Sequence, residues 1–312
     1  AVLMAMPDAK GLFHKAIVQS ASSLLRMAPA GDAERAAYAI LAELNLDKSQ
    51  LEELQRVPAD KLLTAMSASI KETGIDNNRP TVDGRSLPTH PFDPTAPALS
   101  ADVPLLIGTC ETETAFDFSQ NSKNFSLNAA EARARVSFLL GLDDAATDKM
   151  IAAYKRTHPN ATPSELVIYI FSDYKYRQND IKAAELKAAQ GGAPAYMYLF
   201  TWRTPVLDGN LKTPHTLCIP FVFGTVDVAI GITGNSPTRF ALSEKVQKAW
   251  IAFARSGNPN HGGLPQWKQY SAVERTTMIF DNECKAVNDP ASADRIVINT
   301  APFYVAEVAG RR

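Results

Sequence analysis

Short apolar runs alternate with amphipathic stretches along the chain, and this alternation predicts strands separated by helices. Runs rich in β-branched or aromatic residues predict buried strands at 15–19, 104–109 and 195–201, with a last strand at 278–280. Capping residues, first-turn prolines and apolar spacings of three and four predict helices at 32–46, 58–70, 128–140, 143–154, 163–174, 176–190 and 238–255. Strands separated by helices are typical of an α/β fold with a mostly parallel sheet.

Local signals refine two of these helical segments and indicate one further helix start. Asp32 is placed to cap the helix at 32–46, and Ser49 with Glu52 has the spacing of a capping box. In the helix at 238–255, the spacing of the large apolar residues predicts one buried face made of Phe240, Val246, Trp250 and Phe253.

No linker divides the chain, so we expect residues 1–312 to belong to one domain. Residues 74–99 are rich in Pro, Asn, Asp and Gly and predict a long surface passage, with an extended piece at 79–84. The chain starts with Ala1, and residues 1–7 have the apolar pattern of the interior of a buried helix. A natural N-terminus is usually polar. We therefore expect the chain to be the C-terminal portion of a longer domain.

Composition and charge exclude several classes of protein. Hydrophobic residues make up 46% of the chain, enough for a sizeable core, and the net charge of −1 gives no basic excess for nucleic acid. No apolar run reaches the length of about 18 residues that a membrane span needs. Cys110, Cys218 and Cys284 are far apart in sequence, which predicts buried or idle thiols and leaves one disulfide possible.

An acid and a histidine follow two of the predicted strands. Glu113, with Glu111 as its rival, follows the strand at 104–109, and His215 follows the strand at 195–201. Loops at the carboxyl ends of parallel strands carry the chemistry of such sheets, and a carboxylate there can orient a general-base histidine. The order acid then histidine matches α/β-hydrolases, but the chain has no G-x-S-x-G nucleophile motif. The early serines, Ser20, Ser22 and Ser23, have no flanking glycines.

Five segments, in order, resemble the carboxylesterase type-B family, which includes bacterial para-nitrobenzyl esterases and the cholinesterases. They are residues 7–20, the Pro-Thr-Val-Asp-Gly passage at 80–84, the strand and acid loop at 104–113, the histidine segment at 213–224, and the late helix and turn at 250–260 with Trp267. The resemblance covers nearly the whole chain. It implies an α/β-hydrolase fold, present here without its nucleophile elbow.

The resemblance also implies a serine carboxylic-ester hydrolase with a Ser-Glu-His triad. The family's acid stands five positions after a strand-end glycine, which here is Gly108, so Glu113 is favoured over Glu111. His215 matches the family's histidine, and Ser20 matches a buried serine with a supporting hydrogen bond. The nucleophile would lie about seven residues before Ala1. The chain departs from the family at residues 112–114, Thr-Glu-Thr, where Asp-Glu-Gly is common, and this departure puts the loop shape in question.

The remaining expectations concern ligands and alternatives. The resemblance implies a small-molecule ester as substrate, with no cofactor or metal, and no nucleic-acid partner. Apolar residues near the two loops are expected either to line the substrate pocket or to pack in the core: Phe116, Phe118 and Leu217. A cholinesterase-like interaction protein without catalysis, and a carbamate, amide or thioester hydrolase, remain alternatives. The compartment is open, with the cytoplasm favoured over secretion or the periplasm.

Overall fold

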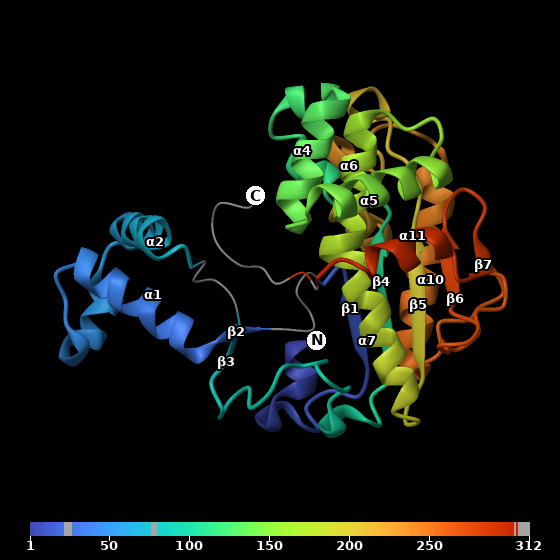
Figure 1. Cartoon of the computed structure of the whole chain (residues 1–312). Helices are drawn as coiled ribbons and strands as arrows, with labels where there is room; N and C mark the ends of the chain where they lie inside the picture. The colour runs from blue at the N-terminus through green and yellow to red at the C-terminus, as the bar shows by residue number, and fades with distance from the viewer. Residues whose placement is uncertain (22–26, 76–79, 303, 305–312) are drawn as a thin grey trace.

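A five-stranded sheet forms the centre of the molecule (Figure 1). The computed structural model describes residues 1–21, 27–75, 80–302 and 304. The strand order is β1-β4-β5-β6-β7, with bounds Ala16–Gln19, Leu105–Cys110, Ala195–Phe200, Thr276–Phe280 and Lys285–Asn288. The first four strands run parallel and β7 runs antiparallel to β6. The sheet is therefore mostly parallel, as the alternation of strands and helices predicts.

Helices cover both faces and one end of this sheet. The 3-10 helices are η1 to η5 and η7, at Val2–Ala5, Pro7–Ala9, Lys48–Arg56, Ala98–Ser100, Ser122–Ser126 and Val206–Gly209. The α-helices α1 to α11 span Ala30–Glu43, Ala59–Thr73, Ala115–Phe118, Ala129–Leu140, Asp144–Thr157, Pro163–Ser172, Gln178–Ala189, Cys218–Phe223, Ile230–Thr233, Thr238–Ser256 and Ser292–Ile298. A π-helix, η6, joins α6 to α7 over Asp173–Arg177.

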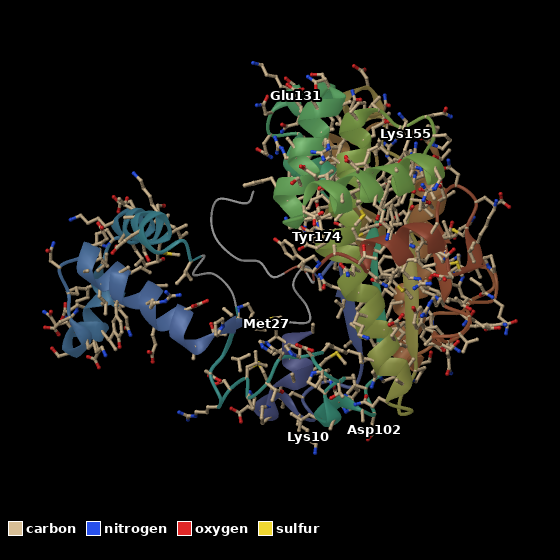
Figure 2. The ribbon with its side chains drawn as sticks, viewed as in Figure 1. Lys10, Met27, Asp102, Glu131, Lys155 and Tyr174 are labelled. Atoms are coloured by element: carbon tan, nitrogen blue, oxygen red, sulfur yellow. The ribbon has the colours of Figure 1, made fainter. Side chains whose placement is uncertain are left out.

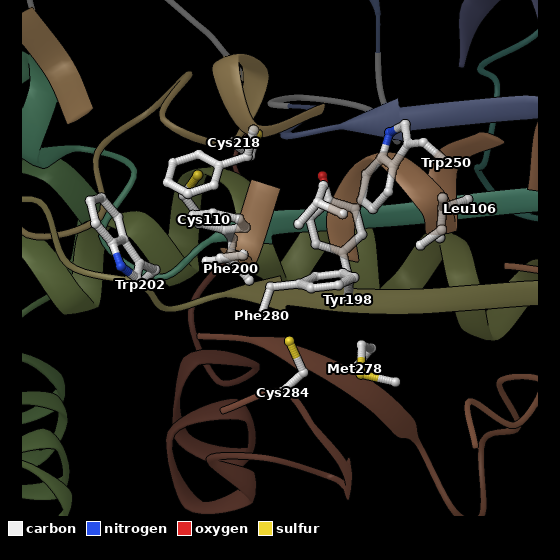
Figure 3. Close-up of a cluster of buried hydrophobic side chains, with 14 of the residues drawn as sticks. Leu106, Cys110, Tyr198, Phe200, Trp202, Cys218, Trp250, Met278, Phe280 and Cys284 are labelled. Carbon is white, nitrogen blue, oxygen red and sulfur yellow. The ribbon is translucent and has the colours of Figure 1, made fainter. Parts of the chain in front are cut away.

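Alternate residues of the central strands point to opposite faces, so the sheet has two cores. On one face, Ile107 of β4 and Met197 of β5 pack against α7. On the other face, Leu106 and Tyr198 pack against α8 and α10 through a cluster of aromatic side chains (Figure 3). Gly108 of β4 lies under the Tyr198 ring, and a Cβ added there would meet the ring carbon Cδ1 at 2.6 Å. The buried strands therefore require a glycine at this point.

A third core lies among α4, α5, α6 and α11, above the carboxyl ends of the strands. Figure 2 shows Glu131 of α4 and Lys155 of α5 at the outer end of this helical layer, pointing to solvent. Helices α1 and α2 pack against each other to one side of the sheet, next to the two-stranded β2–β3 pair at Ala28–Pro29 and Thr81–Val82 (Figure 1).

Three local predictions need correction, and a fourth is confirmed in part. Helix α1 begins at Ala30 without a side-chain cap, so Asp32 lies inside its first turn. The capping box of η3 is formed by Asp47 and Gln50, because Asp47 rather than Ser49 has the extended backbone of a cap. Phe240 is 50% exposed under the guanidinium of Arg239, at 4.5 Å from its ring centre, because it lies in the first turn of α10. Part of the extended piece predicted at 79–84 is β3; residue 79 lies outside the described residues.

Candidate active site

Two loops at the carboxyl end of the sheet meet at the candidate site. The acid loop, residues 111–114, follows β4, and the histidine loop, residues 201–217, follows the neighbouring strand β5. Backbone bonds join the loops: the Thr112 N–H donates to the Thr213 carbonyl at 3.2 Å, and the His215 N–H donates to the Glu113 carbonyl at 2.9 Å. The Thr213 N–H also donates to the Thr112 hydroxyl, at 2.8 Å. The parallel register of β4 and β5 therefore brings both side chains to one place.

The Glu113 carboxylate contacts the His215 ring directly. Its Oε2 lies 2.6 Å from His215 Nδ1, and its Oε1 accepts a 2.6 Å hydrogen bond from the Cys110 backbone N–H. The Glu113 side chain is 0% exposed, whereas the His215 side chain is 34% exposed. A buried acid held at both oxygens fixes the ring with Nδ1–H as donor. The second ring nitrogen, Nε2, is left for proton transfer.

Tyr176 supports the His215 ring from the helical layer. The two rings lie 5.1 Å apart between centres at an angle of 31°. Tyr176 belongs to η6, the π-helix between α6 and α7, and its side chain is buried. An extra residue in a helical turn shifts every later side chain around the helix, and such turns are frequent at functional sites. The sequence shows no signal for this turn, so sequence reasoning missed Tyr176.

Glu111 faces away from the histidine, toward Arg203. Its Oε2 lies 3.5 Å from the guanidinium of Arg203, which also donates to the Tyr169 hydroxyl at 3.1 Å. Burial raises the pKa of the Glu111 carboxyl, and the nearby Arg203 opposes this shift. Of the two acids that the sequence offers, the structure therefore brings Glu113 to His215.

The chain is similar in sequence to the proteins of a known family. The family model described as the carboxylesterase family matches residues 1–297. The chain belongs to this family. It is 32% identical over 304 residues to the para-nitrobenzyl esterase of Bacillus subtilis (strain 168), covering 95% of the chain and 58% of that protein. It is 26% identical to human cocaine esterase, covering 88% of the chain and 50% of that protein.

A solved structure of a Geobacillus stearothermophilus carboxylesterase superposes with a TM-score of 0.77 at 30% identity. The match covers 95% of the chain and 60% of that structure. The fold is thus the α/β-hydrolase fold of the carboxylesterases, and the chain spans between half and three fifths of the length of these relatives.

Three other histidines of this carboxylesterase-family chain have different surroundings. His158 Nε2 lies 3.0 Å from Asp294 Oδ2, and its ring stacks on Tyr169 at 4.1 Å between centres. His90 accepts a hydrogen bond from the backbone of Met27, and His261 contacts a backbone carbonyl. His158 therefore has a carboxylate partner as His215 does, but on the helical layer at α5 and α11 and not at a strand end.

Ser20 lies directly after β1 in a left-handed conformation, with φ of 60°. Its hydroxyl is buried and has no hydrogen-bond partner among the described residues. Ser22 and Ser23 lie outside the described residues.

The three apolar residues near the loops divide between core and surface. Phe118 is buried in the core of the helical layer, and Leu217 is fully buried in the core against α8 and α10. Phe116 is 42% exposed. Phe118 and Leu217 therefore pack in the core, which was the alternative to lining the substrate pocket.

In the part of the chain that the structure describes, no three His, Cys, Asp or Glu side chains are grouped to hold a metal ion. None of the described helices combines the length and apolar character that crossing a bilayer requires. Cys110, Cys218 and Cys284 are free and buried.

Proposed function

We propose that the complete protein is a serine carboxylic-ester hydrolase in which Glu113 and His215 are the acid and base of a Ser-Glu-His triad. The observation that carries this proposal is the 2.6 Å contact between a fully buried carboxylate and a partly exposed imidazole. A purely structural role would not require the second ring nitrogen of His215 to lie at a strand-end loop. Substrates of parallel-sheet enzymes bind at such loops. Membership in the carboxylesterase family supports the same reaction.

Each group has one role in the proposed reaction. A serine attacks the ester carbonyl while His215 Nε2 takes its proton, and the same nitrogen later protonates the departing alcohol. Glu113 holds Nδ1–H and stabilises the imidazolium that forms, without itself taking the proton. Backbone N–H groups stabilise the tetrahedral oxyanion, and water then hydrolyses the acyl-enzyme. The proposed substrate is a small-molecule carboxylic ester, and the reaction uses no cofactor or metal.

We place the nucleophile and oxyanion hole in sequence that precedes Ala1, with the serine about seven residues upstream. Residues 1–312 are then the C-terminal portion of one catalytic domain, and we expect this portion alone to have no esterase turnover. Strand β1 pairs with β4 along one of its edges, and an open strand edge promotes aggregation. A monodisperse 312-residue chain that unfolds cooperatively and hydrolyses esters would contradict this part of the proposal.

The nucleophile is tested by labelling the complete protein with a fluorophosphonate and mapping the modified peptide. We expect the label on a serine just upstream of Ala1, and much slower labelling in a His215→Ala variant because the base is lost. His158→Ala is the matched control, since that histidine also pairs with a carboxylate but lies elsewhere. A label on Ser20 would show a misplaced nucleophile, and folded protein without label would favour a non-catalytic relative.

A further inference from the structure

Helix α6 contacts the histidine loop at two places. The Lys212 ammonium lies 2.5 Å from Glu165 Oε1, in the first turn of α6. One helical turn later, the Tyr169 hydroxyl accepts a hydrogen bond from the Arg203 guanidinium at 3.1 Å. Residues four apart lie on the same face of a helix, so Glu165 and Tyr169 turn one face of α6 toward the loop.

Both contacts lie at the neck of the histidine loop, which we define as residues 202–204 and 212–213. The Thr204 N–H donates to the Lys212 carbonyl at 2.9 Å, and the Thr213 hydroxyl donates to the Trp202 carbonyl at 3.1 Å. The Thr213 N–H is bonded to the acid loop. The neck therefore fixes the segment that carries His215, and Lys212 lies three residues before that histidine.

Lys212 has a left-handed backbone conformation, with φ of 50°. Glycine enters this region readily, whereas a residue with a Cβ adopts it at a cost in free energy. Leu207, Asp208 and Thr216 of the same loop also have positive φ. Strained conformations persist only where the surrounding structure fixes them. The side chain of Lys212 thus gives a reason for a lysine at a position whose backbone favours glycine.

The ion pair is shielded from solvent and held on both carboxylate oxygens. The Lys212 side chain is 10% exposed and the Glu165 side chain is 25% exposed. Glu165 Oε2 accepts a 2.7 Å hydrogen bond from the Thr162 N–H in the capping box of α6. Burial by itself raises the pKa of the Glu165 carboxyl, but Lys212 and the Thr162 N–H outweigh burial and hold this pKa below its usual value. The charged carboxylate therefore ties α6 to the neck.

We propose that Lys212 and Glu165 are positioning residues for His215, and that their ion pair holds the histidine loop in the geometry that proton transfer needs. A general base must lie within hydrogen-bond reach of the proton it takes. A displacement of about 1 Å can lower turnover about 100-fold. The effect on turnover rests on the proposed function, whereas the effect on the position of the His215 ring does not.

The first test is the hydrolysis of a nitrophenyl ester by the complete protein with Lys212→Met, which keeps the side-chain stem and removes the charge. We expect kcat to fall about 10–100-fold while KM stays within about threefold, because a displaced base acts on the transition state. Lys212→Arg keeps a cation, and its kcat should lie closer to that of the parent. Lys248→Met is the matched control, since Lys248 forms an exposed pair of 2.6 Å with Glu244 on α10. Parent kcat in Lys212→Met would overturn the proposal.

Two further variants separate the ion pair from the backbone. Lys212→Gly relieves the left-handed backbone but removes the ammonium, so kcat should fall as in Lys212→Met; parent kcat in this variant would also overturn the proposal. Glu165→Gln removes the charge and keeps a residue that suits the capping box. Adding it to Lys212→Met should lower kcat no further, because the shared interaction is already lost. Losses that multiply would show that the two residues act independently, against the proposal.

The position of the ring is followed separately from turnover by NMR of ¹³C-labelled histidine in the same proteins, with urea unfolding to show that each is folded. The His215 Cε1–H signal, assigned by its loss in His215→Ala, should shift or broaden in Lys212→Met and stay in place in Lys248→Met. If Lys212→Met does not fold, Glu165→Gln serves for both measurements. An unchanged His215 signal would overturn the positioning role. A shifted signal in a protein without esterase turnover would leave that role standing and reject the proposed function instead.

Discussion

Replacing Glu113 by glutamine tests the structure at its most constrained point. The carboxylate accepts two hydrogen bonds of 2.6 Å, from the Cys110 N–H and from His215 Nδ1–H, and it is fully buried. A glutamine side chain has nearly the same shape but offers one acceptor oxygen and one NH₂ donor. In Glu113→Gln, one of the two N–H groups must therefore face another donor, or the His215 ring must move its proton to Nε2.

The first outcome lowers folding stability and the second lowers kcat, each by an amount that can be stated. A buried donor left without a partner costs about 1–3 kcal/mol of folding stability. A proton moved to His215 Nε2 leaves that nitrogen unable to accept the proton of a nucleophile, and the equivalent Asp→Asn change in a serine-protease triad lowers kcat about 10⁴-fold. At about 1.4 kcal/mol per tenfold change, this is a loss of about 5 kcal/mol of transition-state stabilisation. We therefore expect a large fall in kcat with a modest loss of stability.

The assay is the hydrolysis of a nitrophenyl ester by the complete protein, with urea unfolding measured on the same samples. Glu111→Gln is the matched control, because Glu111 lies two residues away in the same loop and faces Arg203 at 3.5 Å. We expect that variant to stay within about tenfold of the parent, since the Glu111 carboxylate contacts Arg203 and not His215. A Glu113→Gln protein whose kcat is also within tenfold of the parent would refute the assigned role of the carboxylate.

Two further predictions concern packing and pH. Gly108→Ala should destabilise the protein by about 1–3 kcal/mol or more, because the new methyl group meets the Tyr198 backbone carbonyl and ring, whereas Gly31→Ala has open space and should be neutral or stabilising in urea unfolding. Hydrogen bonding to Asp294 raises the pKa of His158 above its usual value of about 6.5. The stabilisation from this pair is thus complete below about pH 6.5 and is lost as pH rises through the raised pKa. The difference in unfolding free energy between the parent and Asp294→Asn should shrink from about pH 5 to about pH 9; a difference that is constant or grows would contradict the pairing.

The main strands and the longer helices were predictable because each repeats a local pattern. The strands β4 and β5 are buried on both faces, so they are continuous apolar runs that stand out in the sequence. Strand β7 was missed because Lys285–Asn288 is largely exposed at the edge of the sheet and has no apolar run. The burial of Phe240 was predicted wrongly. The spacing of apolar residues along a helix does not show where the surface that the helix packs against ends.

The candidate site was predictable as a pair of loops but not as a set of contacts. The order of Glu113 and His215 after successive strands, with the family resemblance, was enough to name them. The backbone N–H of Cys110 and the ring of Tyr176 carry no signal in the sequence, because the first is common to every residue and the second depends on a π-turn. Both positions follow from how neighbouring segments pack.

Taken alone, the sequence determined the α/β class and the central strands, since hydrophobic periodicity and residue order are properties of the chain itself. With the family resemblance it also named Glu113 and His215 as the candidate acid and histidine. The tertiary structure decided that Glu113 contacts His215 while Glu111 faces Arg203, although the two acids are only two residues apart. Contacts of this kind depend on the register of parallel strands and the turns that follow them, and residues distant in sequence become neighbours only when the sheet forms.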